Sequence, residues 1–195
     1  MVMLILTSAN KNYIKRILTV LNDSLSASQV TFANQSGKVS LKSKINDEAP
    51  LAEKALVTVL SNLINFKKSA TVEIVCNDQR VVGGGPIEDK NGTKYLIDIS
   101  DVEKFRDGIR PGSAALVIMH EFVELSWMQF KGLTQTEGHA LACKAEFEIT
   151  GAERPLVGWP IVYKRDKSVV TTLSWTKYDD NHKQYPCKIN VVSYN

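Results

Sequence analysis

The stretch SAALVIMHEFVELSWMQFKGLTQTEGHALACKAEFEITG, residues 113–151, predicts two consecutive helices, and this pair decides the fold. The first helix is apolar on nearly every side up to Phe130 and is followed by Gly132, a residue typical of the position after a helix end. Thr134 and Glu137 then fit a capping box, in which side chains bond the first backbone N–H groups of a helix. Because the connection is only a few residues long, we expect the two helices to be antiparallel neighbours.

The apolar first helix carries three ionisable side chains, which are His120, Glu121 and Glu124. Carboxylates almost never occur in a buried helix unless they are paired or bound to a cation, because an unpaired buried charge is costly. Residues four apart share a helix face, so His120 and Glu124 point the same way, while Glu121 is rotated from them by about 100°. This spacing predicts two metal ligands and one neighbouring carboxylate that acts as a base.

The second helix presents a matching set at helical spacing, His139, Cys143 and Glu146, among small residues that allow a close approach to its neighbour. Facing each other, the two helices could gather His120, Glu124 and His139 around one ion. Glu146 could be the fourth ligand or the hydrogen-bond partner of a histidine. A water molecule would complete the coordination and lose a proton to the neighbouring base.

Structural interpretations stay open for the same residues. His120 and Glu124 could form a hydrogen-bonded pair without any ion, and His139 could be a solvated residue in a polar first turn. Cys143 is more typical of a small core residue than of a ligand. Glu148 is an alternative downstream ligand on the second helix.

The remainder of the chain predicts a mixture of strands and helices. The elements expected before the helix pair are a strand at residues 3–7, a helix after Asn10, a hairpin turned at residues 35–37, a helix over residues 47–65, and strands at residues 71–76 and 95–99. Beyond Pro155, three strand-like runs predict a β tail. The sum is an α+β fold with a mixed sheet, two central antiparallel helices that carry the site, and a C-terminal β segment, in a single domain over residues 1–195.

Two local patterns in the first half carry specific expectations. The helix over residues 47–65 would include Leu51 on its inner face and Pro50 in its first turn, where the missing N–H does no harm. The run of glycines at residues 83–85 is followed by neither a Lys-Ser/Thr pair nor a helical pattern. It therefore favours a flexible connection over a phosphate-binding loop. Because Asn91-Gly92 precedes the next strand, the segment predicts either a hairpin or a glycine-rich loop followed by a strand.

Composition gives no support for a nucleic-acid partner and does not by itself indicate a function. Apolar residues make up 44% and charged residues 23%, as in an ordinary globular protein, and the net charge of +3 is scattered rather than gathered into a nucleic-acid-binding stripe. Three distant cysteines favour reduced thiols over a disulfide framework. With neither a membrane span nor a secretory leader in the sequence, we expect cytoplasmic synthesis, no membrane partner, and delivery elsewhere only by a dedicated secretion or injection system. The oligomeric state is left open.

The segment IMHEFVEL, residues 118–125, resembles the active-site helix of the zincin metallopeptidases, whose motif is HExxH. Its context is similar to small peptidase domains of bacterial effectors and polymorphic toxins. The shared features are a strand ending in aspartate (NGTKYLIDIS), a small-residue lead-in (RPGSAALVIM) and a later G-x-P-x-x-Y segment (GWPIVY). A second similarity, to phage-associated HExxE metalloproteins, includes a following helix with H-x-x-A-x-x-x-E, matched by His139, Ala142 and Glu146. Together these resemblances cover about residues 90–163.

The resemblance implies a zincin-like fold and a zinc metallopeptidase that acts on a protein or peptide substrate as an effector or toxin. By position in the motif, His120 carries over as a ligand and Glu121 as the base. Glu124 occupies the place where the family has histidine, and a carboxylate there widens the choice of metal from zinc toward manganese or iron. An alternative is a non-catalytic, metal-stabilised interaction module of a phage-like or secretion particle.

Overall fold

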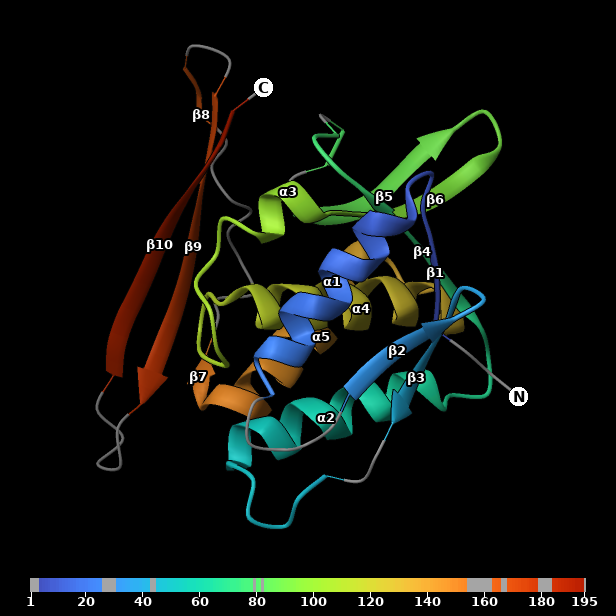
Figure 1. Cartoon of the computed structure of the whole chain (residues 1–195). Helices are drawn as coiled ribbons and strands as arrows, with labels where there is room; N and C mark the ends of the chain where they lie inside the picture. The colour runs from blue at the N-terminus through green and yellow to red at the C-terminus, as the bar shows by residue number, and fades with distance from the viewer. Residues whose placement is uncertain are drawn as a thin grey trace.

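A computed structural model describes residues 4–25, 31–42, 45–78, 80–81, 83–153, 163–165, 168–178 and 184–194, with the backbone alone beyond Ala152. This part of the chain is α+β: it contains a mixed six-stranded sheet, five helices and a separate C-terminal sheet (Figure 1). None of the described helices has the length and apolarity that crossing a membrane requires. The α+β class and the mixed sheet predicted from the sequence are therefore confirmed.

The main sheet has the strand order β2-β3-β1-β4-β6-β5. The strand bounds are β1 Leu4–Thr7, β2 Thr31–Gln35, β3 Lys38–Lys42, β4 Ala70–Val75, β5 Gly84–Asp89 and β6 Gly92–Asp98. The neighbouring strands β1, β4 and β6 run parallel, whereas the β2–β3 hairpin and β5 are added antiparallel at the two ends. Along β4, buried Val72 and Ile74 alternate with the more accessible Thr71 and Glu73, as expected where helices cover one face of a sheet.

Helix α1, Lys11–Asp23, begins at the N-cap Asn10, whose side chain accepts a hydrogen bond from the Asn12 N–H at 3.0 Å. Its buried residues recur at helical spacing and face the core: Ile14, Ile17, Leu18 and Leu21. The helix and the hairpin predicted beside it are both present, with the hairpin turned at Ser36 and Gly37.

Helix α2 spans Leu51–Ile64, later than the predicted start at residue 47, because Pro50 is its N-cap and not a residue of its first turn. The placement of Leu51 on the inner face is also wrong, since this side chain is 82% exposed. The physical reason is the helical angle: nine residues at about 100° each place Leu51 opposite the buried Leu60.

Helices α4, Ala114–Lys131, and α5, Gln135–Thr150, lie side by side in the centre of the molecule (Figure 1). Gly132 adopts the left-handed conformation at φ 67° after α4, and the capping box of Thr134 and Glu137 starts α5, as predicted. A Cβ on Gly138 would lie 3.0 Å from the Glu124 carbonyl oxygen, so the absence of a side chain there permits close packing of the two helices.

A second sheet follows α5 and is visible beside the helical body in Figure 1. Its strands are β7 Ala152–Glu153, β8 Tyr163–Arg165, β9 Ser168–Tyr178 and β10 Gln184–Tyr194. Strands β9 and β10 are antiparallel along their whole length, and both β7 and β8 pair with β9. The predicted β tail is therefore present, although most of the GWPIVY segment lies outside the described residues.

Candidate metal centre

Four titratable side chains meet at the interface between α4 and α5. His120 and Glu124 come from one face of α4, and His139 and Glu146 come from α5. His120, the earlier residue on α4, contacts Glu146, the later residue on α5. Glu124, the later residue on α4, contacts His139, the earlier residue on α5. This pattern shows that the helices are antiparallel, as the short connection predicted.

Three donor atoms of this group converge on one point. The Nε2 atom of His120 lies 3.2 Å from Oε2 of Glu124 and 3.1 Å from Nδ1 of His139. The third side of the triangle, from Nδ1 of His139 to Oε2 of Glu124, is 3.1 Å. Ligand atoms about 2.0–2.1 Å from a tetrahedral ion are separated by roughly 3.3 Å. The three side chains could therefore hold a metal ion with little rearrangement.

Glu146 contacts the other edge of the His120 ring. Its Oε1 lies 2.6 Å from Nδ1 of His120, within a strong hydrogen bond to a charged acceptor. An ionised carboxylate only accepts, so Nδ1 of His120 is the donor in this bond, and in the neutral imidazole the lone pair of Nε2 is then directed at Glu124 and His139. Glu146 therefore contacts His120 from the side opposite the three converging atoms and is not one of them, a position that suits the second of the two roles left open by the sequence.

The cluster is buried except on one side. His120, Glu124 and Glu146 are buried, whereas the His139 side chain is 25% exposed, so solvent can approach the cluster from α5. Burial raises the pKa of Glu124, but hydrogen bonds to His120 and His139 outweigh that effect and hold the pKa at about 2. Glu124 is thus ionised at neutral pH, and its hydrogen bond with Nε2 of His120 at 3.2 Å requires the imidazole to carry a second proton. In the neutral imidazole, Nε2 instead directs a lone pair at the Glu124 oxygen. Two electron-rich atoms so close repel each other unless a proton or a metal cation lies between them.

Glu121 lies apart from the three converging donor atoms, on the side of α4 that faces strand β5. A Cβ built on Gly84 would be 2.7 Å from Cδ and 2.9 Å from Cγ of Glu121, so this half-buried side chain rests directly on the backbone of β5. The offset from His120 and Glu124 expected from helical geometry is therefore present. The contact with β5 was not expected.

The glycine run at residues 83–85 differs from its expectation. A flexible connection was predicted, but Gly84 and Gly85 belong to β5 and pair with Ile97 and Leu96 of β6. The three successive glycines could have indicated the contact with Glu121, because glycine inside a strand often marks a close approach by another group. The strand predicted to extend to Ile99 instead ends at Asp98, where the unpredicted short helix α3, Ile99–Val102, begins.

The remaining candidate ligands lie outside the group. Cys143 is buried in α5 but contributes no atom to the three that converge, and Glu148 is exposed on the same helix. The carboxylate of the second helix that contacts His120 is Glu146, whereas Glu148 lies outside the group.

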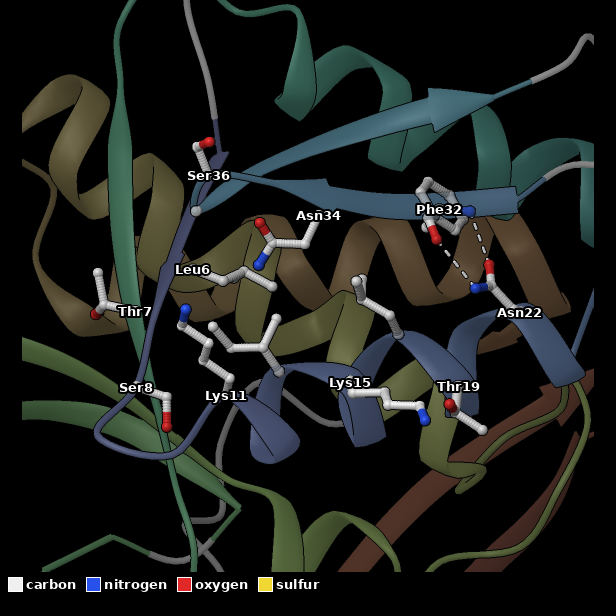
Figure 2. A pocket seen from close by; sticks show the side chains of 13 residues that line it. Leu6, Thr7, Ser8, Lys11, Lys15, Thr19, Asn22, Phe32, Asn34 and Ser36 are labelled. Atoms are coloured by element: carbon white, nitrogen blue, oxygen red, sulfur yellow. Dashed lines mark hydrogen bonds between the residues drawn. The ribbon is translucent and has the colours of Figure 1, made fainter.

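A groove of about 800 Å³ lies elsewhere, between α1, the end of β1 and the β2–β3 hairpin (Figure 2). Asn22 closes one end, where its side chain donates to the Phe32 carbonyl at 3.0 Å and accepts from the Phe32 N–H at 2.7 Å. Lys11 and Lys15 also line the groove, whereas the described lining contains neither a histidine nor a carboxylate. The titratable groups suited to metal chemistry therefore belong to the α4–α5 interface.

No protein-family model, curated protein or solved structure matches this chain. The chemistry of the α4–α5 cluster consequently carries the assignment of function.

Proposed function

We propose that this protein is a metal-dependent hydrolase of zincin-like architecture, in which His120, Glu124 and His139 bind zinc. The observation that carries the proposal is the convergence of three donor atoms at 3.1–3.2 Å, with one histidine oriented by Glu146. The mixed donor set of two nitrogens and one oxygen suits zinc and also accepts manganese or iron. An ion bound there would supply Lewis-acid chemistry, lowering the pKa of a coordinated water molecule and polarising the bond under attack.

Two further residues have proposed roles in the reaction. Glu146 holds the His120 ring by its Nδ1–H, which keeps Nε2 available and makes the nitrogen a stronger donor. Glu121 is the proposed general base. Hydrolysis joins the oxygen of water to the carbonyl carbon and breaks the C–N bond. Glu121 accepts the proton that water loses and returns it to the departing nitrogen.

An extended peptide is the proposed substrate class. In the described part of the chain, β5 pairs only with β6 and ends the sheet, and the side chain of Glu121 lies against its backbone. A strand edge beside a base suits a substrate that adds itself as a further strand through main-chain hydrogen bonds. The resemblance to peptidase domains of effectors and toxins extends the proposal to that biological role.

A non-catalytic interaction module of a phage-like or secretion particle is the second candidate. It is favoured by Glu124, whose negative charge weakens a bound ion as a Lewis acid compared with the histidine of the zincin motif. The paired strands β9 and β10, eleven residues each, also form an extended surface suited to protein contacts.

Metal analysis tests the centre itself. Protein purified without chelator should contain about one equivalent of metal by elemental analysis, and His120→Ala should lose it. Glu148→Gln, an exposed carboxylate change on α5, is the control and should keep the metal. Absence of stoichiometric metal, or equal metal content in His120→Ala, contradicts the proposal.

Glu121→Gln separates the enzyme from the interaction module. The amide keeps nearly the same shape but no longer accepts a proton, so an enzyme should lose hydrolysis by about 100-fold or more while it keeps metal and melting temperature. An interaction module should be unaffected. The measurement is cleavage of a library of peptides by the metal-loaded protein, with mass spectrometry as the readout.

A further inference from the structure

The three glycines at the start of β5 have different physical requirements. Gly83 and Gly85 have φ values of +75° and +152°, which side-chain-bearing residues rarely adopt. Gly84 has no such backbone requirement. What it lacks is space: an added Cβ would lie 2.7 Å from Cδ and 2.9 Å from Cγ of Glu121, closer than real Cβ contacts. The side chain that occupies this space is the proposed base.

The backbone beside Glu121 is held in place from two directions. The Gly83 N–H donates to Oδ2 of Asp101 at 3.1 Å, and the Gly83 carbonyl accepts from the Asp98 N–H at 2.8 Å. Asp101 is itself buried and paired with Lys104 at 2.6 Å. Gly84 then pairs with Ile97 of β6. The strand therefore cannot easily withdraw from α4.

The preceding turn is anchored by the neighbouring aspartate. The buried carboxylate of Asp98 accepts from the backbone N–H groups of Asn77, Asp78 and Ser100 at 3.1, 2.5 and 2.8 Å. A carboxylate with several backbone donors is a strong and directional anchor. Two separate patterns in the sequence therefore concern the same strand. The aspartate that ends β6 anchors the turn before β5, and the glycine run includes the start of β5.

We propose that Gly84 is a positioning residue for Glu121, with Asp101 holding the bare backbone of β5 against the carboxylate. The side chain is confined between α4 and β5, which restricts its rotamers and fixes the direction from which it can take a proton. This inference rests on the proposed function where it calls Glu121 a base. The physical contact between the two residues does not depend on it.

A double-mutant cycle tests the contact without any assay of activity. Gly84→Ala should lower the melting temperature by about 2–4 °C when Glu121 is present, because the new methyl group overlaps its Cγ and Cδ and the flexible carboxylate end must move away. In the Glu121→Ala background those atoms are gone, so the same change should leave the melting temperature within about 1 °C. Gly84→Val repeats the cycle with a side chain that is better suited to a strand and harder to avoid.

The cycle has two results that overturn the proposal. One is an equal fall in melting temperature with and without Glu121, which would locate the clash elsewhere. The other is no fall in either background for both Gly84 variants, which would show that Glu121 is not confined.

Two further readouts keep this inference distinct from the proposed function. Gly84→Ala should keep the metal content of the unaltered protein by elemental analysis, since the ligand atoms lie on α4 and α5. Where peptide hydrolysis is measurable, kcat should fall by about 10- to 100-fold with KM unchanged, as expected for a misplaced base. If the melting temperatures show coupling between Gly84 and Glu121 but no variant hydrolyses peptides, the contact between the two residues is supported and the enzymatic function is rejected. If Gly84→Ala leaves hydrolysis unchanged, the positioning role of Gly84 is rejected and the enzymatic function is still supported.

Discussion

One pair of buried carboxylates, Asp98 and Asp101, lies where β6 meets α3, and another, Glu124 and Glu146, lies between α4 and α5. The aspartates are held mainly by backbone N–H groups of the turn that leads into β5. Such donors belong to the fold and cannot be released without unfolding the turn. The first pair therefore has a structural role.

The glutamates have a different environment, because both contact histidine nitrogens. A histidine can be a donor, an acceptor or a metal ligand, depending on its protonation. Three atoms of this cluster, two nitrogens and one oxygen, lie 3.1–3.2 Å from one another. The difference between the two pairs shows how buried acids that anchor a backbone can be told from buried acids that could hold a cation.

The largest effect on stability should come from the backbone-anchoring pair. Asp98→Ala leaves the N–H groups of Asp78 and Ser100 without this acceptor and leaves Asn77 N–H with Oγ of Ser100 alone, and should lower the free energy of unfolding by about 3–5 kcal/mol. Urea unfolding measures the loss. The metal content of the protein that remains folded should not change, and a parallel loss of metal would mean that the two pairs are not independent.

Removal of metal should have the next largest effect on stability. This effect should depend on the cluster that contains Glu124 and Glu146. A chelator should lower the free energy of unfolding by about 2–4 kcal/mol, the stabilisation expected from a ligand present at 100–1,000 times its dissociation constant. His120→Ala should show almost no response to the chelator. Thermal unfolding of both proteins with and without EDTA makes the comparison, and equal shifts would place the metal elsewhere.

Glu146→Gln should weaken metal binding without abolishing it. The amide remains able to accept from Nδ1–H of His120 but lacks the charge, so we expect a 10- to 100-fold loss of affinity, about 1.4–2.7 kcal/mol. Competition with a zinc indicator dye measures the affinity. Glu148→Gln removes an exposed carboxylate from the same helix and should have no effect. Complete loss of metal in Glu146→Gln would instead make Glu146 a direct ligand.

The smallest effect is the dependence of the metal-free protein on pH. The folded-state pKa of Glu124, about 2, lies below its ordinary value of 4.5. Its stabilising contribution is therefore complete above about pH 5 and is lost as pH falls toward 2. Between pH 5 and pH 4 the loss should be less than about 1 kcal/mol. Urea unfolding of the chelated protein should show this loss for the unaltered chain and not for Glu124→Gln, and parallel curves would contradict it.

The helix pair was predictable because its signals are local. Capping residues, a glycine after each helix and apolar spacing define α4 and α5 within the segment itself. The same geometry placed His120 and Glu124 on one face, and the short connection brought His139 beside them. What local spacing could not decide was the role of Glu146, because reaching Nδ1 or Nε2 of the ring depends on how the two helices are rotated against each other.

The contact of Glu121 with Gly84 could not be predicted for a related reason. Gly84 and Glu121 belong to a strand and a helix that are distant in sequence, and only the packing of α4 on the sheet brings them together. The start of α2 was misplaced because Pro50 was expected in the first turn, a position that proline tolerates, whereas it is the N-cap. Helix α3 is a single turn, too short for periodicity to reveal.

The three-residue connection between α4 and α5 has a consequence for how the centre is made. His120 and His139 are 19 residues apart, and Glu146 follows His120 by 26, so the loops that must close are short and their entropic cost is low. Native contacts of this kind form early in folding. A nascent chain could therefore capture its ion once the second helix has left the ribosome, before the C-terminal sheet is synthesised, and the bound cation would then act as a template for the rest of the domain.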